Sequence, residues 1–430
     1  MADEAAAVTG QCLATGERDQ PIAPTHPAVK GVPGAQTAGA ALISFNAGAY
    51  ESYGKTQNFN APVSTRVAHG YTAALNHLLS QRGERHIVIG PVSVVFWTER
   101  PTRFEADFGR AFARPEATAE DESRAEAIRT ALERLAQGKD AIPPEEAGAR
   151  FFVLGLSPNA ARLAVRFWSS DSLDVMADRV ARHLSDIDLV RQWDWQPRYP
   201  SVWALAMETK VKYRGDGDHA KPDLNDEGLA KLHADLLRAV LTGGPYPASL
   251  LSVLLDRIRA DRVVNHPRLA MIKALLVRQA RHADPTLQEG NNLVSLDENR
   301  QDIGYRLGRL FAVLERIQQA AADGRDLNAT IRDKHVGSAS ATPRASFPYL
   351  LELAQKHLKK VRRDKPGLAR LLDTRLAEIQ DSMTGFPATL DLEQRGLFFL
   401  GYYHERAYRK ADKPADAEPS DLADLLSVPE

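Results

Sequence analysis

The spacing of apolar residues changes once along this chain, near Asp171, and that change limits the folds it can adopt. Before it lie short apolar runs of strand length. After it apolar residues recur every three or four positions, as at Ile303, Leu307, Leu310 and Leu314. A period near 3.6 is that of an α-helix, whereas strands alternate or form short apolar runs. We therefore predict an α+β fold: a mixed strand and helix N-terminal part followed by an all-helical C-terminal bundle.

Local patterns place the expected elements. In the first part we expect strands at residues 40–45, 86–90, 92–97, 150–156 and 162–168, and a helix at 64–81 with Ser64 as its N-cap. In the second part the periodic segments predict helices at 171–191, 226–242, 246–260, 267–281, 300–322, 345–363, 367–383 and 391–409. The segment Leu397–Tyr403 is apolar nearly all round and is expected to be a buried central helix, with Gly396 and Gly401 allowing close packing.

Charge and composition divide the chain further. Residues 115–147 hold nine Asp and Glu residues against four Lys and Arg, and they resemble a mobile acidic insertion. We expect a partial α+β domain over residues 1–170, a helical connecting domain over 171–290, a C-terminal helical bundle over 291–410 and an acidic disordered tail over 411–430.

The bulk composition is that of a soluble globular protein, with 43% hydrophobic residues and a net charge of −1 over 430 residues. The sequence contains no apolar run long enough to span a membrane and does not begin like a secretory signal. The single cysteine, Cys12, excludes an internal disulfide and a multi-cysteine metal site. We expect a cytoplasmic protein without a membrane partner.

The segment from Gly48 to Ser64, GAYESYGKTQNFNAPVS, begins like a phosphate-binding loop of an NTPase. That loop has four residues between its glycines, because successive N–H groups must curl around a phosphate, and a helix follows it at once. Here Gly48 and Gly54 enclose five residues, and the polar stretch after Thr56 is poor helix sequence. The spacing and the context both argue against an NTPase.

The same loop has a composition that suits nucleic acid. Lysine contacts phosphate, Gln and Asn contact base edges, and tyrosine stacks on bases. The alternative is a polar turn whose asparagines bond to its own backbone. The residue chemistry leaves both interpretations open.

A basic block in the second part is a second candidate surface for anions. Residues 325–375 hold twelve Lys and Arg residues against five Asp and Glu. In the expected helix 345–363 the cations repeat on a face opposite the apolar stripe, and the small residues of 337–344 would let backbone N–H groups approach a phosphate. A soluble bundle with a basic surface explains the composition equally well.

Catalytic motifs are not found. No His is followed by Asp, His404-Glu405 lacks the second histidine of a zinc protease motif, and no nucleophile elbow occurs. We expect no catalytic residue, no metal site and no cofactor.

Several long strings resemble one known family, the large subunit of the type I-C CRISPR interference complex (the Csd family). They include CLATGERDQPIAPTHPAVKGVPGAQTAGAALISFNAGAYESYGKTQNFNAPVS at 12–64, VLGLSPNAARLAVRFW at 153–168, GYRLGRLFAVLERIQ at 304–318, NATIRDKHVGSASATPRASFPYLL at 328–351 and GLFFLGYYHER at 396–406. The resemblance covers nearly the whole chain, from about Cys12 to Arg406. Members carry a further segment before the Cys12 stretch, so we expect this chain to lack part of the family's N-terminal region, which helps hold the guide's 5′ handle.

The resemblance implies a non-catalytic subunit of an RNA-guided antiviral complex. Its partners would be guide RNA with backbone and handle-binding subunits, double-stranded target DNA, the displaced single strand, and a helicase-nuclease recruited after target binding. The family's large subunit recognises the protospacer-adjacent motif and supports the displaced strand. The helical C-terminal part resembles the separate small subunit of related complexes and can be made alone by internal translation.

With this resemblance the candidate residues fall into two DNA-binding sets. For the motif duplex we expect contacts from Tyr53, Lys55, Gln57, Asn58, Asn60, Asn159, Arg162 and Arg166. For the displaced strand we expect contacts from Arg332, Lys334, Arg344, Lys356, Lys359, Lys360 and Arg363. The rival functions are a helical structural adaptor without direct DNA contact, and a P-loop-like NTPase or nucleolytic enzyme.

Overall fold

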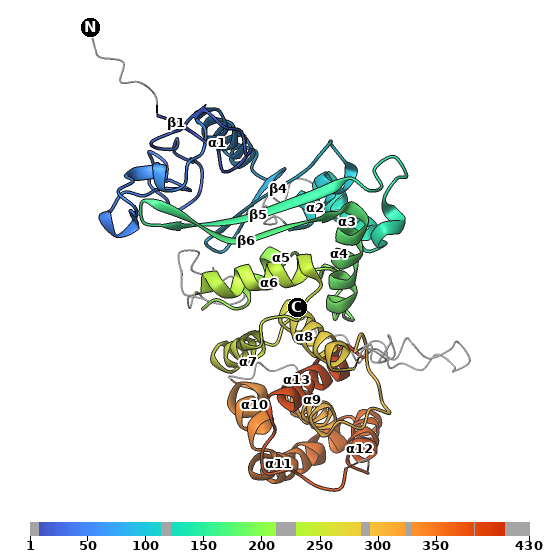
Figure 1. Ribbon diagram of the computed structural model, residues 1–430. Helices are drawn as coiled ribbons and strands as arrows, with labels where there is room; N and C mark the ends of the chain where they lie inside the picture. Colours follow the sequence, from blue (N-terminus) through green and yellow to red (C-terminus); the bar gives the residue numbers. More distant parts are fainter. Residues whose placement is uncertain are drawn as a thin grey trace. The chain divides into compact units, whose positions relative to one another are not determined.

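The computed structural model describes residues 8–112, 122–211, 229–284, 293–323, 329–381 and 383–408 (Figure 1). The chain forms two compact units. Unit 1 comprises residues 1–185 and 201–247, and unit 2 comprises residues 186–200 and 248–430. The domain boundaries expected near residues 170 and 290 stay predictions, and the expected acidic tail lies outside the described residues.

Unit 1 is built on an antiparallel sheet, which among the described residues has four strands in the order β3-β4-β5-β6. Its strands are β3 (His86–Ile89), β4 (Val92–Thr98), β5 (Arg150–Asn159) and β6 (Arg162–Ser172). A short pair, β1 (Thr9–Gly10) and β2 (Gln20–Pro21), lies apart from this sheet. The strands of the N-terminal part and the helices that follow confirm the predicted α+β class.

The hairpin of β5 and β6 is longer than the sequence predicted. Asn159 pairs with Arg162, so the connection is the two residues Ala160 and Ala161, with Ala160 at φ 52°. The strand expected to end at residue 156 continues through Ser157 and Pro158, which remain in the ladder. The ladder shifts register between Gly155 and Leu156, and the absence of a side chain at Gly155 leaves room for the Phe167 ring, which lies 2.3 Å from where a Cβ of Gly155 would be.

A helix that the sequence analysis did not predict, α2 (Arg103–Phe112), covers part of the sheet. Its Phe108 ring lies 4.8 Å from the ring of Phe96 on β4 and 5.1 Å from that of Phe151 on β5. The Glu105 carboxylate accepts from the Thr98 backbone N–H at 2.8 Å and fixes the helix to the end of β4. This aromatic layer is the core of that end of the sheet.

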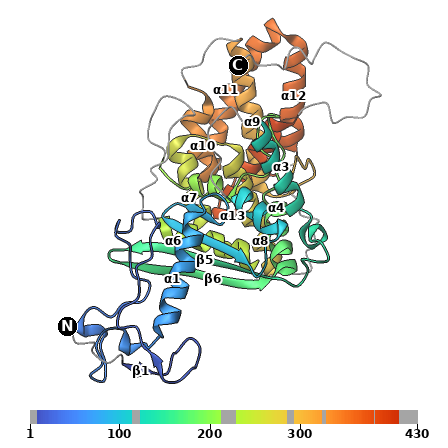
Figure 2. The same cartoon turned by 90° about the horizontal axis from the view of Figure 1, so that it is seen from above.

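Helix α1 (Thr65–Ser80) packs against β3 and β4, and its ribbon runs across the strand direction in Figure 2. The Ser64 hydroxyl accepts from the Val67 N–H at 3.4 Å, which confirms the predicted N-cap. The strand expected at 40–45 was wrong. Only isolated bridges, Val29 to Ala40 and Ala41 to Arg162, occur there, so no ladder holds the segment in a sheet.

The remaining helices of unit 1 are α3 (Glu122–Leu135), α4 (Leu173–Ile187), α5 (Val202–Met207) and α6 (Ala230–Thr242). The described part of the acidic insertion packs against α2, because Arg134 on α3 binds the Asp107 carboxylate at 2.5 and 2.7 Å. From residue 129 onward Ala131, Leu132 and Leu135 are buried, and the expectation that this stretch is mobile stays a prediction.

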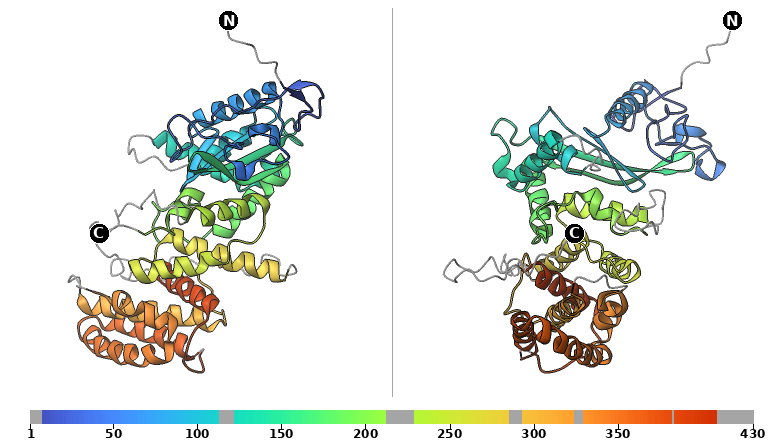
Figure 3. Two further views of the ribbon diagram at one scale, coloured as in Figure 1. Left: turned by 60° about the vertical axis from the view of Figure 1, so that its left-hand side comes forward. Right: turned by 180° about the vertical axis from the view of Figure 1, so that it is seen from behind.

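Unit 2 contains helices and no strand in its described residues. Its helices are α7 (Ser249–Asp261), α8 (His266–Ala283), α9 (Ile303–Ala322), α10 (Ile331–Ala341), α11 (Pro343–Asp364), α12 (Pro366–Asp381) and α13 (Leu392–Ala407). Figure 3 shows those from residue 303 onward side by side, drawn in orange and red. The small residues Gly337 to Ala341 belong to α10, so their N–H groups are taken up by the helix and are not available to a phosphate.

Glycines set the closest contact of this unit, between α9 and α13. A Cβ on Gly308 would lie 1.9 Å from the Phe398 carbonyl oxygen, and one on Gly401 would lie 2.1 Å from that of Tyr305. On α9, Gly304 lies one turn before Gly308, and a Cβ there would lie 2.1 Å from the Gln394 carbonyl oxygen. Only a hydrogen fits at these positions, so α13 is the buried central helix that the sequence predicted.

The segment 186–200 completes unit 2 from a distant part of the sequence. The Asp186 carboxylate, fully buried, binds Arg278 at 2.8 Å and Arg281 at 2.6 Å, and its carbonyl oxygen accepts from the Lys273 ammonium at 2.9 Å. The Val190 N–H donates to the Val294 carbonyl oxygen at 2.7 Å. Helix α8 therefore depends on a carboxylate that lies 92 and 95 residues before the two arginines it binds.

Candidate nucleic-acid interface

Residues 46–60 form an ordered loop on unit 1 that presents Tyr53 to solvent. Two short 3₁₀ turns, Gly48–Tyr50 and Gln57–Asn60, flank a turn in which the Lys55 N–H donates to the Ser52 carbonyl oxygen at 3.0 Å. Tyr53 and Gly54 both have positive φ, 54° and 68°. Left-handed backbone is uncommon for a tyrosine and persists where the surrounding structure imposes it, in tight turns and at functional sites. The Tyr53 side chain is 98% exposed, and Lys55 beside it is exposed as well.

Two of the amide residues expected to contact DNA are taken up by the fold of this loop. Asn60 accepts from the Ser52 N–H at 2.8 Å and donates to the carbonyl oxygens of Lys55 and Gln57 at 2.9 and 2.8 Å. Asn58 is 2% exposed. Buried polar groups are satisfied within the protein, so this geometry does not favour base contacts by either residue, and their contact with DNA stays a prediction. Gln57 remains exposed.

The loop is not an NTPase phosphate loop. Helix α1 begins at Thr65, nine residues after Thr56, whereas a phosphate loop leads directly into its helix. The segment before Gly48 is not a strand. Neither the strand nor the helix N-terminus that such a site requires is present around residues 48–56.

The structure brings the β5–β6 turn to the same loop, 112 residues away in the sequence. The Arg162 guanidinium binds the Asn46 side-chain oxygen and lies over the Tyr50 ring, 4.4 Å from its centroid. Asn159 is exposed at the turn, and Arg166 donates to the Ser157 hydroxyl at 2.5 Å. We call residues 46–60 together with 159–162 the loop surface. The loop surface therefore brings residues predicted to contact the motif duplex from the 53–60 loop together with Asn159 and Arg162 of the hairpin.

The exposed face of α11 carries a row of cations. Phe347, Leu350, Ala354, Leu358 and Val361 form the buried side of this helix. On the opposite side Tyr349, Glu352, Lys356, Lys359 and Arg363 are all exposed and fall within about 80° of each other on a helix of 3.6 residues per turn. We call these five residues the α11 surface. Three of the seven cations predicted for the displaced strand belong to it.

Two of the predicted cations on α11 have an acidic partner at the surface. Lys356 binds Glu352 at 2.7 Å, and Arg363 binds Asp364 at 2.8 Å. The pKa of Lys356 is raised by its hydrogen bond to Glu352. Exposed pairs of this kind contribute little free energy, so phosphate groups can compete for these cations. Lys334, Arg344 and Lys359 are also exposed.

Two predicted cations have structural roles instead. The Lys360 ammonium donates to the Ala321 carbonyl oxygen at the C-terminal end of α9, where a positive charge is favourable. The Arg332 side chain lies 3.6 Å from Asp333 and 3.9 Å from Glu315, which is buried. Both groups are half-buried and engaged within unit 2, so this geometry does not favour their contact with the displaced strand, which stays a prediction.

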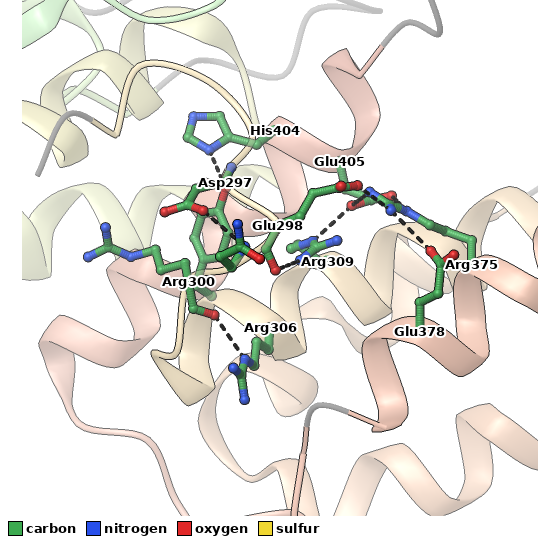
Figure 4. A network of polar contacts seen from close by, with 11 residues as sticks. Asp297, Glu298, Arg300, Arg306, Arg309, Arg375, Glu378, His404 and Glu405 are labelled. Atoms are coloured by element: carbon green, nitrogen blue, oxygen red, sulfur yellow. Dashed lines mark hydrogen bonds and ion pairs between the residues drawn. The ribbon is translucent and has the colours of Figure 1, made fainter. Parts of the chain in front are cut away.

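Within unit 2, a network of ion pairs joins α9, α12 and α13 (Figure 4). The Glu405 carboxylate accepts from Arg309 at 2.9 Å and from Arg375 at 2.7 Å, and Arg375 also binds Glu298. Although burial opposes it, these carboxylates raise the pKa of Arg375. Removing one partner of such a pair leaves a buried charge uncompensated, so the network holds the three helices in register.

His404 is the neutral member of this region. Burial, together with the positive charges of Lys273 and Arg300, lowers its pKa to about 3. Its Nδ1 lies 2.8 Å from the Tyr305 hydroxyl, and the pKa of that hydroxyl is raised to about 12 by burial. The pair of neutral groups is buried away from solvent and packs α9 on α13.

Within the described ranges, no cluster of three or more His, Cys, Asp and Glu side chains could hold a metal ion. None of the helices in the same ranges has the length and apolar character to cross a membrane.

Sequence reasoning missed two aromatic residues at these surfaces. Tyr50, 49% exposed, lies under Arg162, and Tyr349, 54% exposed, lies on the α11 surface. The contact of Tyr50 joins distant segments and has no local pattern. Tyr349 precedes Lys356 by seven residues and could have been placed on its face by helical spacing alone.

No curated protein matches this chain. A family model described as CRISPR-associated protein (Cas_Csd1) matches residues 1–409. That range holds every described residue of both units, including the loop surface and the α11 surface. The chain therefore belongs to the Cas_Csd1 family of CRISPR-associated proteins.

Proposed function

We propose that this protein is the non-catalytic large subunit of an RNA-guided complex that recognises the protospacer-adjacent motif and supports the displaced strand. The loop surface would contact the motif duplex, and the α11 surface would contact the single strand. Guide RNA and the backbone subunits would supply the remainder of target recognition, because base pairing reads the sequence while protein reads the motif and the backbone.

The observation that carries this proposal is the loop surface itself. An ordered loop holds a fully exposed tyrosine next to a lysine, and Arg162 ties it to a hairpin that presents Asn159. Tyrosine, lysine and amide side chains are the groups that stack on bases, contact phosphates and read base edges. Because the loop is already held in one conformation, it loses less conformational entropy when it binds a ligand.

The test uses the chain assembled with guide RNA and its neighbouring subunits, and target duplexes that differ only in the motif. We expect Gln57→Ala or Asn159→Ala to relax motif preference, with a loss on the order of 1–3 kcal/mol for the preferred motif. Lys55→Ala should weaken all duplexes alike. Lys231→Ala is the matched control, since that lysine is also exposed in unit 1 but lies on α6. Unchanged motif preference in both amide variants would refute the assignment of this loop.

A structural adaptor is the second candidate, and the ion pairs of Lys356 and Arg363 favour it. Cations that serve phosphate should give affinity for single-stranded DNA that falls with salt, with a slope set by the number of phosphates contacted. An adaptor should show no such dependence. Measurement of single-strand binding by the full chain over a salt series distinguishes the two.

A further inference from the structure

The α11 surface holds one aromatic ring among its charges. Tyr349 is 54% exposed and shares this face with Lys356, Lys359 and Arg363. Tyr349 and Lys359 are ten residues apart, about 15 Å along the helix axis at 1.5 Å per residue. That length accommodates several nucleotides of a single strand, which rises about 3.4 Å per nucleotide along its axis in stacked DNA.

The ring of Tyr349 has one neighbour that holds it in place. The His335 ring on α10 lies 5.6 Å from it, centroid to centroid, with the planes at 55°. Helix α10 is itself fixed at its start, where the Thr330 N–H donates to the Asp333 carboxylate at 2.8 Å in a capping box. Lys334, exposed, precedes His335 on the same helix. The tyrosine is thus supported on one side and open to solvent over half of its surface.

The surroundings of Tyr349 favour nucleic acid over a protein partner. Cores of protein interfaces are depleted in Lys and Glu, whereas Tyr349 is flanked along its helix face by Glu352, Lys356 and Lys359. Cationic grooves with aromatic platforms are how proteins hold single strands of any sequence, because every base has a face on which a ring can stack. Glu352 is the one acidic member of the α11 surface, and it neutralises Lys356.

We propose that Tyr349 is a base-stacking residue for single-stranded DNA: an unpaired base lies on its ring while Lys356, Lys359 and Arg363 contact neighbouring phosphates. This rests on the proposed function and adds to it the stacking contact and the role of Glu352. Binding of a phosphate displaces Glu352 from Lys356, so the carboxylate weakens the affinity of this surface.

The experiment measures fluorescence anisotropy of a labelled oligothymidylate and of an abasic strand of equal length, each titrated with the full chain. We expect Tyr349→Ala to weaken oligothymidylate binding on the order of ten-fold and to leave the abasic strand unaffected. Tyr349→Phe, which keeps the ring, should bind as the unmodified chain does. Glu352→Gln should tighten the binding of both strands, because it removes a negative charge and frees Lys356.

Two further variants make the outcome decisive. Lys359→Ala should weaken both strands and reduce the salt slope by about one, and Trp195→Ala, which removes an exposed ring elsewhere in unit 2, should change neither. Equal affinity of Tyr349→Ala and the unmodified chain for oligothymidylate, with a loss in Lys359→Ala, would overturn the stacking role and leave the proposed function intact. No salt-dependent binding by the unmodified chain would overturn both.

Discussion

The guanidinium carbon of Arg162 lies 4.4 Å from the centroid of the Tyr50 ring, and the same group binds the Asn46 side chain. This contact joins the β5–β6 turn to the loop of residues 46–60. The contact leaves Arg162 half-buried, so its guanidinium holds the loop in position at least as much as it would bind a ligand.

Replacing Arg162 by Ala should loosen the loop without unfolding unit 1. A cation–π contact at an exposed site contributes about 0.5–1 kcal/mol, a small part of the stability of a domain. We expect faster amide hydrogen exchange at residues 46–60 and a melting temperature within a few degrees of the unmodified chain. Arg162→Lys, which keeps the charge but not the planar fork, should show an intermediate rate. Unchanged exchange in both variants would mean that the contact does not order the loop.

Asn60→Ala should perturb the same loop more strongly. The substitution removes the partner of the Ser52 N–H and the donors to the Lys55 and Gln57 carbonyl oxygens, each bond contributing about 1 kcal/mol net. Asn60→Asp keeps the acceptor for Ser52 but sets a carboxylate against two carbonyl oxygens, and it should restore little. Hydrogen exchange of Ser52 is the measurement, with Lys55→Ala as a control in the same loop that should leave it unchanged.

Gly308→Ala should be strongly destabilising. Its methyl group would lie 1.9 Å from the Phe398 carbonyl oxygen, so α9 and α13 must move apart. Overpacking of a core costs typically about 1–3 kcal/mol, and here the obstacle is rigid backbone. Gly337→Ala on α10, where the nearest heavy atom is 3.6 Å away, should instead stabilise by about 0.5–1 kcal/mol. Denaturant unfolding of the two variants separates the steric effect from the effect of helix propensity. If Gly308→Ala lowered the free energy of unfolding by no more than an ordinary surface substitution does, the close contact of α9 and α13 would be contradicted.

Unfolding of unit 2 should depend on pH through His404. Its pKa is about 3 when folded against an ordinary 6.5, so between these values the unfolded chain binds a proton that the folded chain excludes. The contribution of neutral His404 to the free energy of unfolding is present above pH 6.5, and it is lost by about 1.4 kcal/mol per pH unit as pH falls below 6.5. His404→Gln cannot titrate. From pH 7 to pH 5 we therefore expect the stability of the unmodified chain relative to this variant to fall by about 2 kcal/mol. A constant difference would show that His404 is not buried as a neutral group.

Lys55→Ala also tests the rival enzymatic interpretation. Without a helix directly after the glycine-lysine pair, the loop lacks the N–H groups that hold a nucleoside triphosphate. We expect no ATP hydrolysis attributable to this residue, measured as phosphate release with and without single-stranded DNA. Hydrolysis by the unmodified chain that Lys55→Ala abolishes would restore the NTPase interpretation.

The helices of unit 2 other than α10 could be predicted because each carries its own apolar period, independent of its neighbours. The errors occurred where local signals were weak or depended on distant contacts. The stretch at 337–341 is built of small residues and forms α10 because its start is capped by Thr330 and Asp333 and Val336 is buried. The 40–45 segment looks like a strand in isolation, but its partners meet it only at Ala40 and Ala41.

The candidate site was predictable in chemistry and not in geometry. Composition identified a loop with lysine, tyrosine and amides, but it could not tell which amides the backbone would consume. Asn60 was lost to contacts with residues up to eight positions away, and Arg162 acquired a partner 112 positions away. Helix α2 was missed although Phe104, Phe108 and Phe112 recur at helical spacing.

The membership of Asp186 in unit 2 has a consequence for how that unit can be produced. Because its counter-charges Arg278 and Arg281 lie on α8, a gene fragment that starts after Pro247 would encode every helix from α7 onward and still omit the anion that neutralises them. In the protein made from such a fragment, the guanidinium groups of Arg278 and Arg281 would lack the carboxylate that neutralises them. A synthetic peptide spanning 186–200, supplied in trans, or a permuted reading frame that places those codons after α13, would be needed to restore the missing carboxylate.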